Sequence, residues 1–524
     1  LPRMTDYDAI IVGAGHNGLT AAAVLQQAGL RTLILEQNTY SGGMAATVEL
    51  IDGFKFEIAG SIRFPTASKI NSELGLDTLP VIENEIMSVN IGENGEEPMV
   101  FHHDPMKMMT EMTEKHGMEA VMGMAQLYGW ATGPRKALGR FDALEPPKTI
   151  DEMYACAADE NERQAIHDML FGSAMDVIDR YVPDKERHAV IRGMLAFLAV
   201  NSTYRGPYTP GSATCLAFAL AMPEEGGQMT TKIKGGIGAL SDHLKKLYLD
   251  ASGEIRYRAK VDKILVENAK VTGVRLKDGS TVTAPVVVSN LAPDTTLLDL
   301  VGAEHLPSSL VTRLGGRDHR GSYLQIHFAL DGLPQYAAPY DFLNEPGMQM
   351  SVGMFGSPES QQRQWDNCRF GIVPDNPALS IQIPTVGDPE MAPAGKHAAS
   401  VYVYAFPTEA PREQHGHLKN EMAKVVIDKI TKYAPNFKDI AIRNITFAPY
   451  HMNTMFGAPN GDFCQGLLQP ELMGPNRPGP KGFLDEPIPI EGLYLGGAGC
   501  HGGPGITFIP GYNAGYQVLA DAGR

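Results

Sequence analysis

Three glycines near the start of the chain have the spacing of a phosphate-binding turn. Gly13, Gly15 and Gly18 form G-x-G-x-x-G directly after an apolar run, 9–12, that predicts a buried strand. In such a turn the first glycine allows a tight bend, the second lets a pyrophosphate approach the backbone, and the third lets the following helix pack on the strand. Glu36 ends a second apolar run about 20 residues later, where a carboxylate accepts hydrogen bonds from ribose hydroxyls. The pattern predicts a dinucleotide site.

Two further glycine-rich segments could bring backbone close to the same ligand. Gly42 and Gly43 follow the second predicted strand at once, with Met44 next. Near the other end of the chain, a predicted strand at 493–495 runs into a segment with many glycines, which ends at Gly511 and starts another helix. So many glycines indicate backbone packed against something large and flat, or against phosphate.

These segments resemble the phytoene desaturase and carotenoid isomerase branch of the FAD-dependent oxidoreductases, within the amine-oxidase flavoprotein superfamily. The matching pieces span essentially the whole chain and are 12–19, 33–45, 53–56, 234–244, 286–293, 327–334 and 492–506. The resemblance implies non-covalent FAD. It implies cofactor contacts from Gly42, Gly43 and Met44, and from four positions of the C-terminal segment: Gly497, Gly499, Gly505 and Ile506. It also implies that Val261 gives backbone contacts to the adenine.

The expected fold class is α/β: a discontinuous Rossmann-type FAD-binding domain with a β-meander, plus an α+β substrate domain. We assign residues 1–65, 232–293 and 486–524 to the FAD-binding domain, and residues 66–231 and 294–485 to the substrate domain. Alternating apolar residues predict four meander strands, at 255–258, 261–267, 271–276 and 281–288. The Pro- and Gly-rich stretch 459–489 predicts a long loop.

Composition narrows the function classes. A formal charge of −16 argues against nucleic acid as a partner, because that partner demands a positive face. Lys232, in the densest basic group, is expected on a solvated face. Five scattered cysteines predict neither a disulfide framework nor a zinc site, and we expect no metal. No apolar stretch reaches the length of a membrane span and no signal peptide is recognised, so a cytoplasmic protein is expected, with a peripheral membrane contact left open.

Three titratable residues are candidates for catalytic roles near the flavin. Glu57 and Arg63 lie on a stretch that predicts a strand, 54–64, and either could act as a base or anchor a polar end of the substrate. The alternative is that the two form a structural ion pair. His501 lies in the C-terminal glycine-rich turn and could bond the flavin or move a proton, or could simply cap backbone.

A methionine-dense stretch lies between Met99 and Met124. Methionine adapts to varied apolar ligands and also fills irregular gaps in cores, and core packing is the simpler interpretation.

The expected activity is hydride transfer between flavin N5 and an apolar small molecule. The resemblance favours desaturation of a C–C bond, or isomerisation or saturation, in a polyene or terpenoid-like compound. The electron acceptor, oxygen or a quinone, stays open. Two segments depart from the desaturase pattern at 57–60 and 500–502, so the substrate cannot be carried over. An amine or alcohol oxidase anchored by Glu57 is one alternative, and a non-catalytic binding protein like the Rab escort and GDP-dissociation-inhibitor proteins is another.

Overall fold

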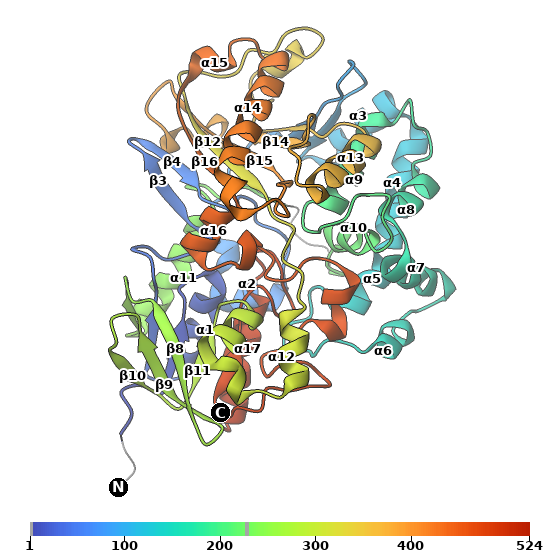
Figure 1. The fold of residues 1–524 in the computed structure, drawn as a ribbon. Coiled ribbons are helices and arrows are strands. Elements are labelled where there is room, and N and C mark those ends of the chain that lie inside the picture. The colour runs from blue at the N-terminus through green and yellow to red at the C-terminus, as the bar shows by residue number, and fades with distance from the viewer. Residues whose placement is uncertain (1–3, 226–229) are drawn as a thin grey trace.

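The computed structural model describes residues 4–225 and 230–524 (Figure 1). A parallel sheet occupies the half that contains both ends of the described chain, and a larger sheet with a layer of helices beside it occupies the other half. This arrangement confirms the predicted α/β class, with a Rossmann-type unit and an α+β unit.

The parallel sheet brings together five strands that are far apart in sequence. Its order is β17 (Leu493–Leu495), β11 (Val287–Ser289), β1 (Ala9–Val12), β2 (Thr32–Leu35) and β7 (Glu254–Arg256). Every residue of β1 and β2 is buried, as expected for apolar runs covered on both faces. Alternate side chains divide between two cores: Ile11 and Ile34 face one cluster, whereas Ile10 and Leu33 face the other.

Helices α1 (His16–Gln27), α11 (Gly238–Asp250) and α17 (Ile509–Asp521) cover the first face. The first and last of these helices approach closely because glycines of α17 face α1. A Cβ atom on Gly511 would collide with the Asn17 carbonyl oxygen, and one on Gly515 would lie 3.0 Å from Val24. The two ends of the chain therefore build one structure, as Figure 1 shows for α1 and α17.

The second face is covered by a three-stranded meander, in the order β10 (Thr281–Thr283), β9 (Lys270–Leu276) and β8 (Val261–Glu267). The four-stranded prediction was wrong at both ends. The first expected strand is β7, which joins the parallel sheet beside β2. The last one splits at Pro285, and its second part is β11 of the parallel sheet. Proline lacks the N–H that a continuous ladder requires.

The second half contains a seven-stranded sheet. Its order is β16 (Ala441–Phe447), β12 (Leu324–Leu330), β15 (His397–Val403), β14 (Leu379–Gln382), β13 (Ser351–Met354), β5 (Ile86–Asn90) and β6 (Met99–His102). Strand β12 is buried along its whole length. The sheet's core includes apolar residues of α14 (His415–Tyr433), which lies beside it at the top of Figure 1.

A layer of helices lies along one side of this sheet (Figure 1). Its members are α3 (Pro105–His116), α4 (Met118–Trp130), α5 (Thr132–Leu138), α6 (Ile150–Ala155), α7 (Glu160–Phe171), α8 (Ala174–Tyr181), α9 (Ala189–Val200) and α10 (Ala213–Leu220). The remaining helices are α2 (Ser68–Leu74), α12 (Ser308–Gly315), α13 (Pro358–Arg369), α15 (Phe437–Ile440) and α16 (Pro449–Phe456).

Two local expectations need correction. The strand predicted across 54–64 ends at Glu57, in the hairpin of β3 (Thr47–Ile51) and β4 (Phe54–Glu57). The methionine stretch divides between two environments, so core packing describes only part of it. Met99, Met112 and Met124 are buried, whereas four methionines of α3 and α4 are more than half exposed: Met106, Met109, Met118 and Met122.

The long loop predicted at 459–489 is present and carries only short 3₁₀ turns, such as those at 459–461 and 470–472. A buried ionic centre ties it to the flavin half. His319 Nδ1 lies 2.8 Å from Asp462 of the loop, and Nε2 lies 2.7 Å from Asp294, which follows β11. Burial alone would lower the pKa of His319, but the two carboxylates outweigh it and raise the pKa to about 9.

No helix among the described residues is long and apolar enough to span a membrane.

The His319 centre predicts a pH-dependent stability. Because the folded-state pKa, about 9, exceeds the ordinary value of 6.5, the stabilisation is complete below about pH 6.5 and is lost as the pH rises through 9. Its size is on the order of 3 kcal/mol. We expect the gap in thermal midpoint between the wild type and His319→Gln to shrink between pH 6 and pH 10. A gap that stays constant over this range would contradict the assignment of a charged His319.

Candidate flavin and substrate site

The glycine turn leaves the start of α1 open to an anion. Gly15 caps the helix without a side-chain hydrogen bond, so the amides of the first turn keep free N–H groups. Gly13 has φ +93°, and a Cβ on Gly18 would collide with the Gly13 carbonyl oxygen. The side-chain nitrogens His16 Nε2 and Asn17 Nδ2 are buried without a partner among the described residues. Free donors at a helix N-terminus fit a pyrophosphate.

Glu36 is held rigidly at the end of β2. One carboxylate oxygen accepts from the Ala14 amide at 2.8 Å, and the other accepts from the Asn38 amide at 2.8 Å. Its backbone carbonyl accepts from the Ala259 amide at 2.8 Å, which fixes the entry to β8 and thus the position of Val261. Burial raises the pKa of Glu36 despite these hydrogen bonds. Each carboxylate oxygen retains a lone pair that could accept from a ribose hydroxyl.

The second glycine pair lies directly against the turn. Gly42 donates from its amide to the Ala14 carbonyl at 2.7 Å, and a Cβ on Gly43 would lie 3.3 Å from the Gly15 Cα. With φ values of +109° and +54°, Gly42 and Gly43 adopt conformations that side chains disfavour. The structure therefore joins the predicted turn and the predicted pair at one place.

The C-terminal segment closes the same site. The Met44 carbonyl accepts from the Gly60 amide at 2.8 Å, and a Cβ on Gly60 would lie 2.7 Å from Ile506 Cδ1. The His16 ring meets the Phe508 ring edge-on, with centroids 5.4 Å apart. The predicted cofactor residues of both chain ends are thus brought together.

Asn290, which we did not single out from the sequence, links these segments. Its side chain lies under the glycine turn, where a Cβ on Gly18 would come within 3.2 Å of Asn290 Nδ2. A Cβ on Gly497 would lie 2.5 Å from the Asn290 carbonyl oxygen, so this glycine is also required for the close approach. Gly499 donates from its amide to Gln465 Oε1 at 3.2 Å. Asn290 lies within the segment 286–293, which resembles the family, and that resemblance was the sequence signal that could have pointed to it.

Arg477 is the second residue that sequence reasoning missed. It is fully buried in the long loop and has no carboxylate partner among the described residues; instead it donates to backbone carbonyls of both the loop and the C-terminal segment. Its Nε reaches the Cys500 carbonyl at 3.0 Å. Burial lowers the pKa of Arg477 to about 10. The guanidinium thus fixes the backbone on which His501 lies.

Glu57 pairs with Lys232 rather than with Arg63. Lys232 Nζ lies 2.8 Å from one carboxylate oxygen, and the Ile237 amide donates to the other at 2.9 Å. Lys232 is therefore buried in an ion pair, not on the expected solvated face. Burial raises the pKa of Glu57, although Lys232 opposes the shift.

Arg63 donates to the Leu76 carbonyl and to Asn71 Oδ1, each at 2.9 Å. His501 is buried in the C-terminal glycine-rich segment, and its Nε2 has no partner among the described residues. Burial, aided by the charge of Arg477, lowers the pKa of His501 to about 4, so the imidazole is neutral near pH 7. The structure therefore brings none of the three predicted catalytic residues into contact with another.

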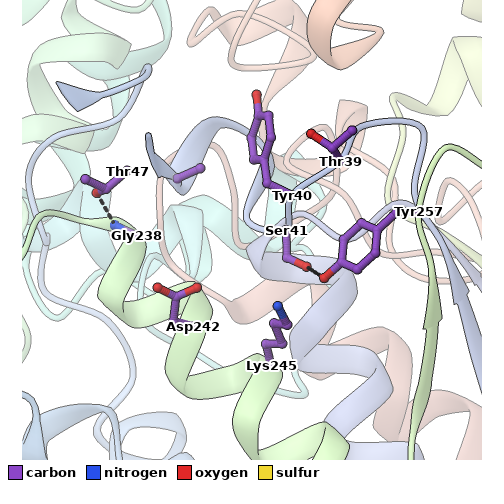
Figure 2. A pocket seen from close by; sticks show the side chains of 9 residues that line it. Thr39, Tyr40, Ser41, Thr47, Gly238, Asp242, Lys245 and Tyr257 are labelled. Atoms are coloured by element: carbon purple, nitrogen blue, oxygen red, sulfur yellow. Dashed lines mark hydrogen bonds between the residues drawn. The ribbon is translucent and has the colours of Figure 1, made fainter. Parts of the chain in front are cut away.

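A polar cavity of about 200 Å³ opens beside the second glycine pair, between the 39–47 loop and the start of α11 (Figure 2). Ser41 Oγ and the Tyr257 hydroxyl lie 2.7 Å apart across one wall, and the Gly238 amide donates to Thr47 Oγ1 at 2.9 Å on the other. Figure 2 shows Asp242 and Lys245 of α11 at its floor. The cavity is polar and therefore does not suit an apolar substrate. Within residues 4–225 and 230–524, no cluster of His, Cys, Asp or Glu could hold a metal ion.

Replacing Glu36 should weaken FAD binding. Loss of hydrogen bonds to a charged acceptor costs about 1.5–3 kcal/mol, so we expect the Kd of Glu36→Ala for FAD to rise roughly 10- to 100-fold. Fluorescence titration of the apoprotein with FAD measures this change, and the thermal midpoint of the apoprotein reports any unfolding. The exposed Glu267→Ala is the matched control and should bind FAD as the wild type does. Equal affinity of all three proteins would contradict the role of Glu36.

Comparisons with known proteins agree with this geometry. A family model described as flavin containing amine oxidoreductase matches residues 18–517. The pyridine nucleotide-disulfide oxidoreductase domain-containing protein 2 of Rattus norvegicus is 27% identical, over 98% of this chain and 94% of that protein. The chloroplastic prolycopene isomerase of Daucus carota is 26% identical, over 100% of this chain and 82% of that protein.

Among solved structures, a putrescine oxidase variant has the same fold, with a TM-score of 0.62 at 15% identity over 98% of each chain. The predicted family resemblance and the predicted FAD cofactor are confirmed. The family match also supports an enzyme over the alternative of a non-catalytic escort-type binding protein. The chain belongs to the flavin containing amine oxidoreductase family, whose members are FAD-dependent oxidoreductases.

Proposed function

We propose that this flavoenzyme desaturates or isomerises a C–C bond of a polyene or terpenoid-like compound. FAD supplies hydride transfer at N5 when it is bound, and the protein supplies binding, orientation and exclusion of water. In this proposal residues 1–65, 232–293 and 486–524 bind FAD, and residues 66–231 and 294–485 bind the substrate. The name of the prolycopene isomerase relative supports a polyene substrate.

The observation that carries the proposal is that both carboxylate oxygens of Glu57 already have partners within the protein. An amine oxidase needs a group that anchors a cationic substrate, and Glu57 was the sequence's candidate. Both of its oxygens are already engaged, one by Lys232 at 2.8 Å and the other by the Ile237 amide at 2.9 Å. A second cation brought to this pair would meet the ammonium of Lys232, which costs Coulomb energy in a buried place. We therefore assign Glu57 a positioning role at the start of α11.

Aromatic side chains between the flavin loop and the seven-stranded sheet support an apolar substrate. The Tyr323 ring lies 5.4 Å from that of Tyr404 and 5.1 Å from that of Phe463, centroid to centroid. Met44 and Ala46 of the second glycine segment pack against the same cluster. Extended polyenes bind by dispersion and apolar contact, which aromatic side chains of this kind provide.

His501 is the proposed catalytic group with a free atom. A neutral imidazole can hold a proton on one nitrogen and accept one on the other, and Nε2 of His501 has no acceptor or donor beside it among the described residues. Arg63, by contrast, donates from Nη1 to the Leu76 carbonyl and from Nη2 to Asn71 Oδ1. We therefore assign it a positioning role on the segment that follows β4.

Anaerobic reduction of the flavin tests the reaction class. The purified holoenzyme is mixed without oxygen with matched panels of polyene or terpenoid compounds and of primary amines, and the visible flavin absorbance is followed. We expect bleaching by members of the polyene and terpenoid panel, or isomer formation detected by chromatography, at rates at least about 10-fold above those with any amine. Quinone and oxygen are then compared as acceptors for the reduced enzyme.

Bleaching by amines alone would overturn the proposal and promote an amine oxidase. In that case Lys232→Met should change amine turnover strongly, since it would free the Glu57 carboxylate.

We also propose a peripheral membrane contact, supported by the four exposed methionines of α3 and α4. Their side chains are 53–73% exposed on two consecutive helices that pack against each other. Unbranched apolar side chains on a surface suit insertion among lipid chains, where apolar substrates and quinones reside.

Replacing Met106, Met109, Met118 and Met122 together by Gln should lower cosedimentation with phosphatidylcholine vesicles by at least about 10-fold, because the loss of buried apolar area weakens insertion. Phe370→Gln is the control, since Phe370 is 77% exposed at the end of α13. Unchanged cosedimentation of the methionine variant would exclude this surface.

A further inference from the structure

Arg140 is a buried cation that the proposed reaction does not yet use. It follows α5 and is 6% exposed. Among the described residues it forms no ion pair, and neither Nε nor Nη1 finds a hydrogen-bond acceptor. Burial without a counter-charge lowers the pKa of Arg140. A buried, unpaired charge is costly, so such a group usually serves a ligand or a partner.

Two aromatic rings lie against the guanidinium of Arg140. Its Cζ lies 3.9 Å from the Phe218 ring centroid and 4.7 Å from that of Phe141. The rings stabilise the cation through its faces, but the N–H groups point outward in the guanidinium plane and need acceptors there. The guanidinium therefore has apolar neighbours, and its in-plane N–H groups at Nε and Nη1 lack an acceptor among the described residues.

Other buried arginines of the chain show how the fold normally satisfies this group. Arg192 donates to Asp179 and to the Val182 carbonyl, each at 2.6 Å, and Arg477 is surrounded by carbonyl oxygens. Arg140 differs from both, because no carboxylate or carbonyl of the described residues has been placed at Nε or Nη1. Arg317 also leaves Nε and Nη1 without a hydrogen bond, but its Nη2 donates to the Gln465 carbonyl and its Nε lies 3.9 Å from Asp294. Arg140 has no such carboxylate beside it among the described residues.

The position lies beside the C-terminal flavin segment. A Cβ on Gly139, the residue before Arg140, would be 3.5 Å from the imidazole of His501. The Leu144 amide donates to Asn513 Oδ1 of α17 at 2.7 Å, so the segment 139–144 packs on the C-terminal part of the site. Two buried side chains with unpartnered nitrogens, Arg140 and His501, therefore belong to segments that pack against each other.

We propose that Arg140 binds the carboxylate of the substrate, which makes the substrate an apolar acid with an unsaturated or saturable chain rather than a pure hydrocarbon. This inference rests on the proposed function and narrows it to one substrate class. The guanidinium forms charge-assisted hydrogen bonds with the carboxylate, while Phe141 and Phe218 contact its first carbons. A phosphate dianion is disfavoured, because a single cation with aromatic walls leaves one negative charge unpaired.

Binding to the holoenzyme tests the proposal without turnover. Isothermal titration calorimetry under nitrogen compares two acids, geranate and decanoate, with the corresponding alcohols, and geranyl phosphate serves as the dianionic probe. We expect each acid to bind the wild type at least about 10-fold more tightly than its alcohol. In Arg140→Met this preference should disappear, whereas Arg140→Lys should keep part of it. Arg363→Met, at an exposed position of α13, is the matched control and should keep the full preference.

Stability gives a second readout that a structural role would not produce. Because an unpaired buried charge is removed, the thermal midpoint of Arg140→Met should stay equal to that of the wild type or rise. A large fall of the midpoint, with acids and alcohols bound equally by the wild type, would overturn the proposal, as would absence of acid binding. Tighter binding of the phosphate than of geranate would overturn the carboxylate assignment. A changed flavin reduction potential with unchanged acid preference would place Arg140 against the flavin instead.

These results are independent of the reaction class. Acid preference without flavin bleaching by any hydrocarbon or acid would contradict the proposed reaction and leave the anchor standing. Bleaching by hydrocarbons without a preference for acids would support the proposed reaction and contradict the role of Arg140 as a carboxylate anchor.

Discussion

Direct backbone-to-backbone approach is the constraint on which the cofactor site depends. The first glycine turn meets the second glycine pair backbone to backbone, and the C-terminal segment approaches the backbone of Asn290, whose side chain lies under the turn. Gly43 lies against the Gly15 Cα, and a Cβ on Gly497 would come within 2.5 Å of the Asn290 carbonyl oxygen. Side chains at such positions would collide with the facing backbone and would fill the space that a pyrophosphate needs. Glycine is therefore a requirement of the assembly as well as of the local turns.

The same constraint explains why the site could be predicted from sequence to a large extent. Glycines in these segments, and Glu36 at the end of a strand, leave local patterns that require no knowledge of the fold. The strand at 493–495 and the helix after it were also found, because both have the expected apolar period. Asn290 escaped, since the glycine turn that it contacts lies far from it in sequence, near the start of the chain. Arg477 escaped because its acceptors are backbone carbonyls, such as those of Gly466 and Cys500, which leave no pattern of residue types in the sequence. Nothing in the neighbouring residues of an arginine shows whether carbonyls will surround it.

The errors in the fold have a related cause. An apolar alternation shows that a segment is a strand and does not show which strand it pairs with. The segment at 254–256 has the alternation of a meander strand, yet it pairs with β2, because the parallel sheet has a free edge there. Glu57 and Lys232 were treated as an anchor and a surface charge, respectively. Their contact closes over 175 sequence positions and converts two separate expectations into one buried ion pair.

The cations inside the protein differ in the groups that neutralise or accept hydrogen bonds from them. This difference distinguishes cations with a structural role from one that could recognise a ligand. His319 and Lys232 are paired with carboxylates, and Arg477 with carbonyls, so their charges hold segments in place. Arg140 contacts the rings of Phe141 and Phe218 and has no acceptor at Nε or Nη1 among the described residues. Arg317 also lacks hydrogen bonds at Nε and Nη1, but its Nε lies 3.9 Å from Asp294, whereas Arg140 has no carboxylate partner among the described residues. A buried charge without a counter-charge is kept only at a cost to the stability of the fold. In our proposal, a ligand carboxylate pairs with Arg140 and removes the destabilisation caused by the unpaired charge. That gain in free energy appears as binding free energy for the substrate.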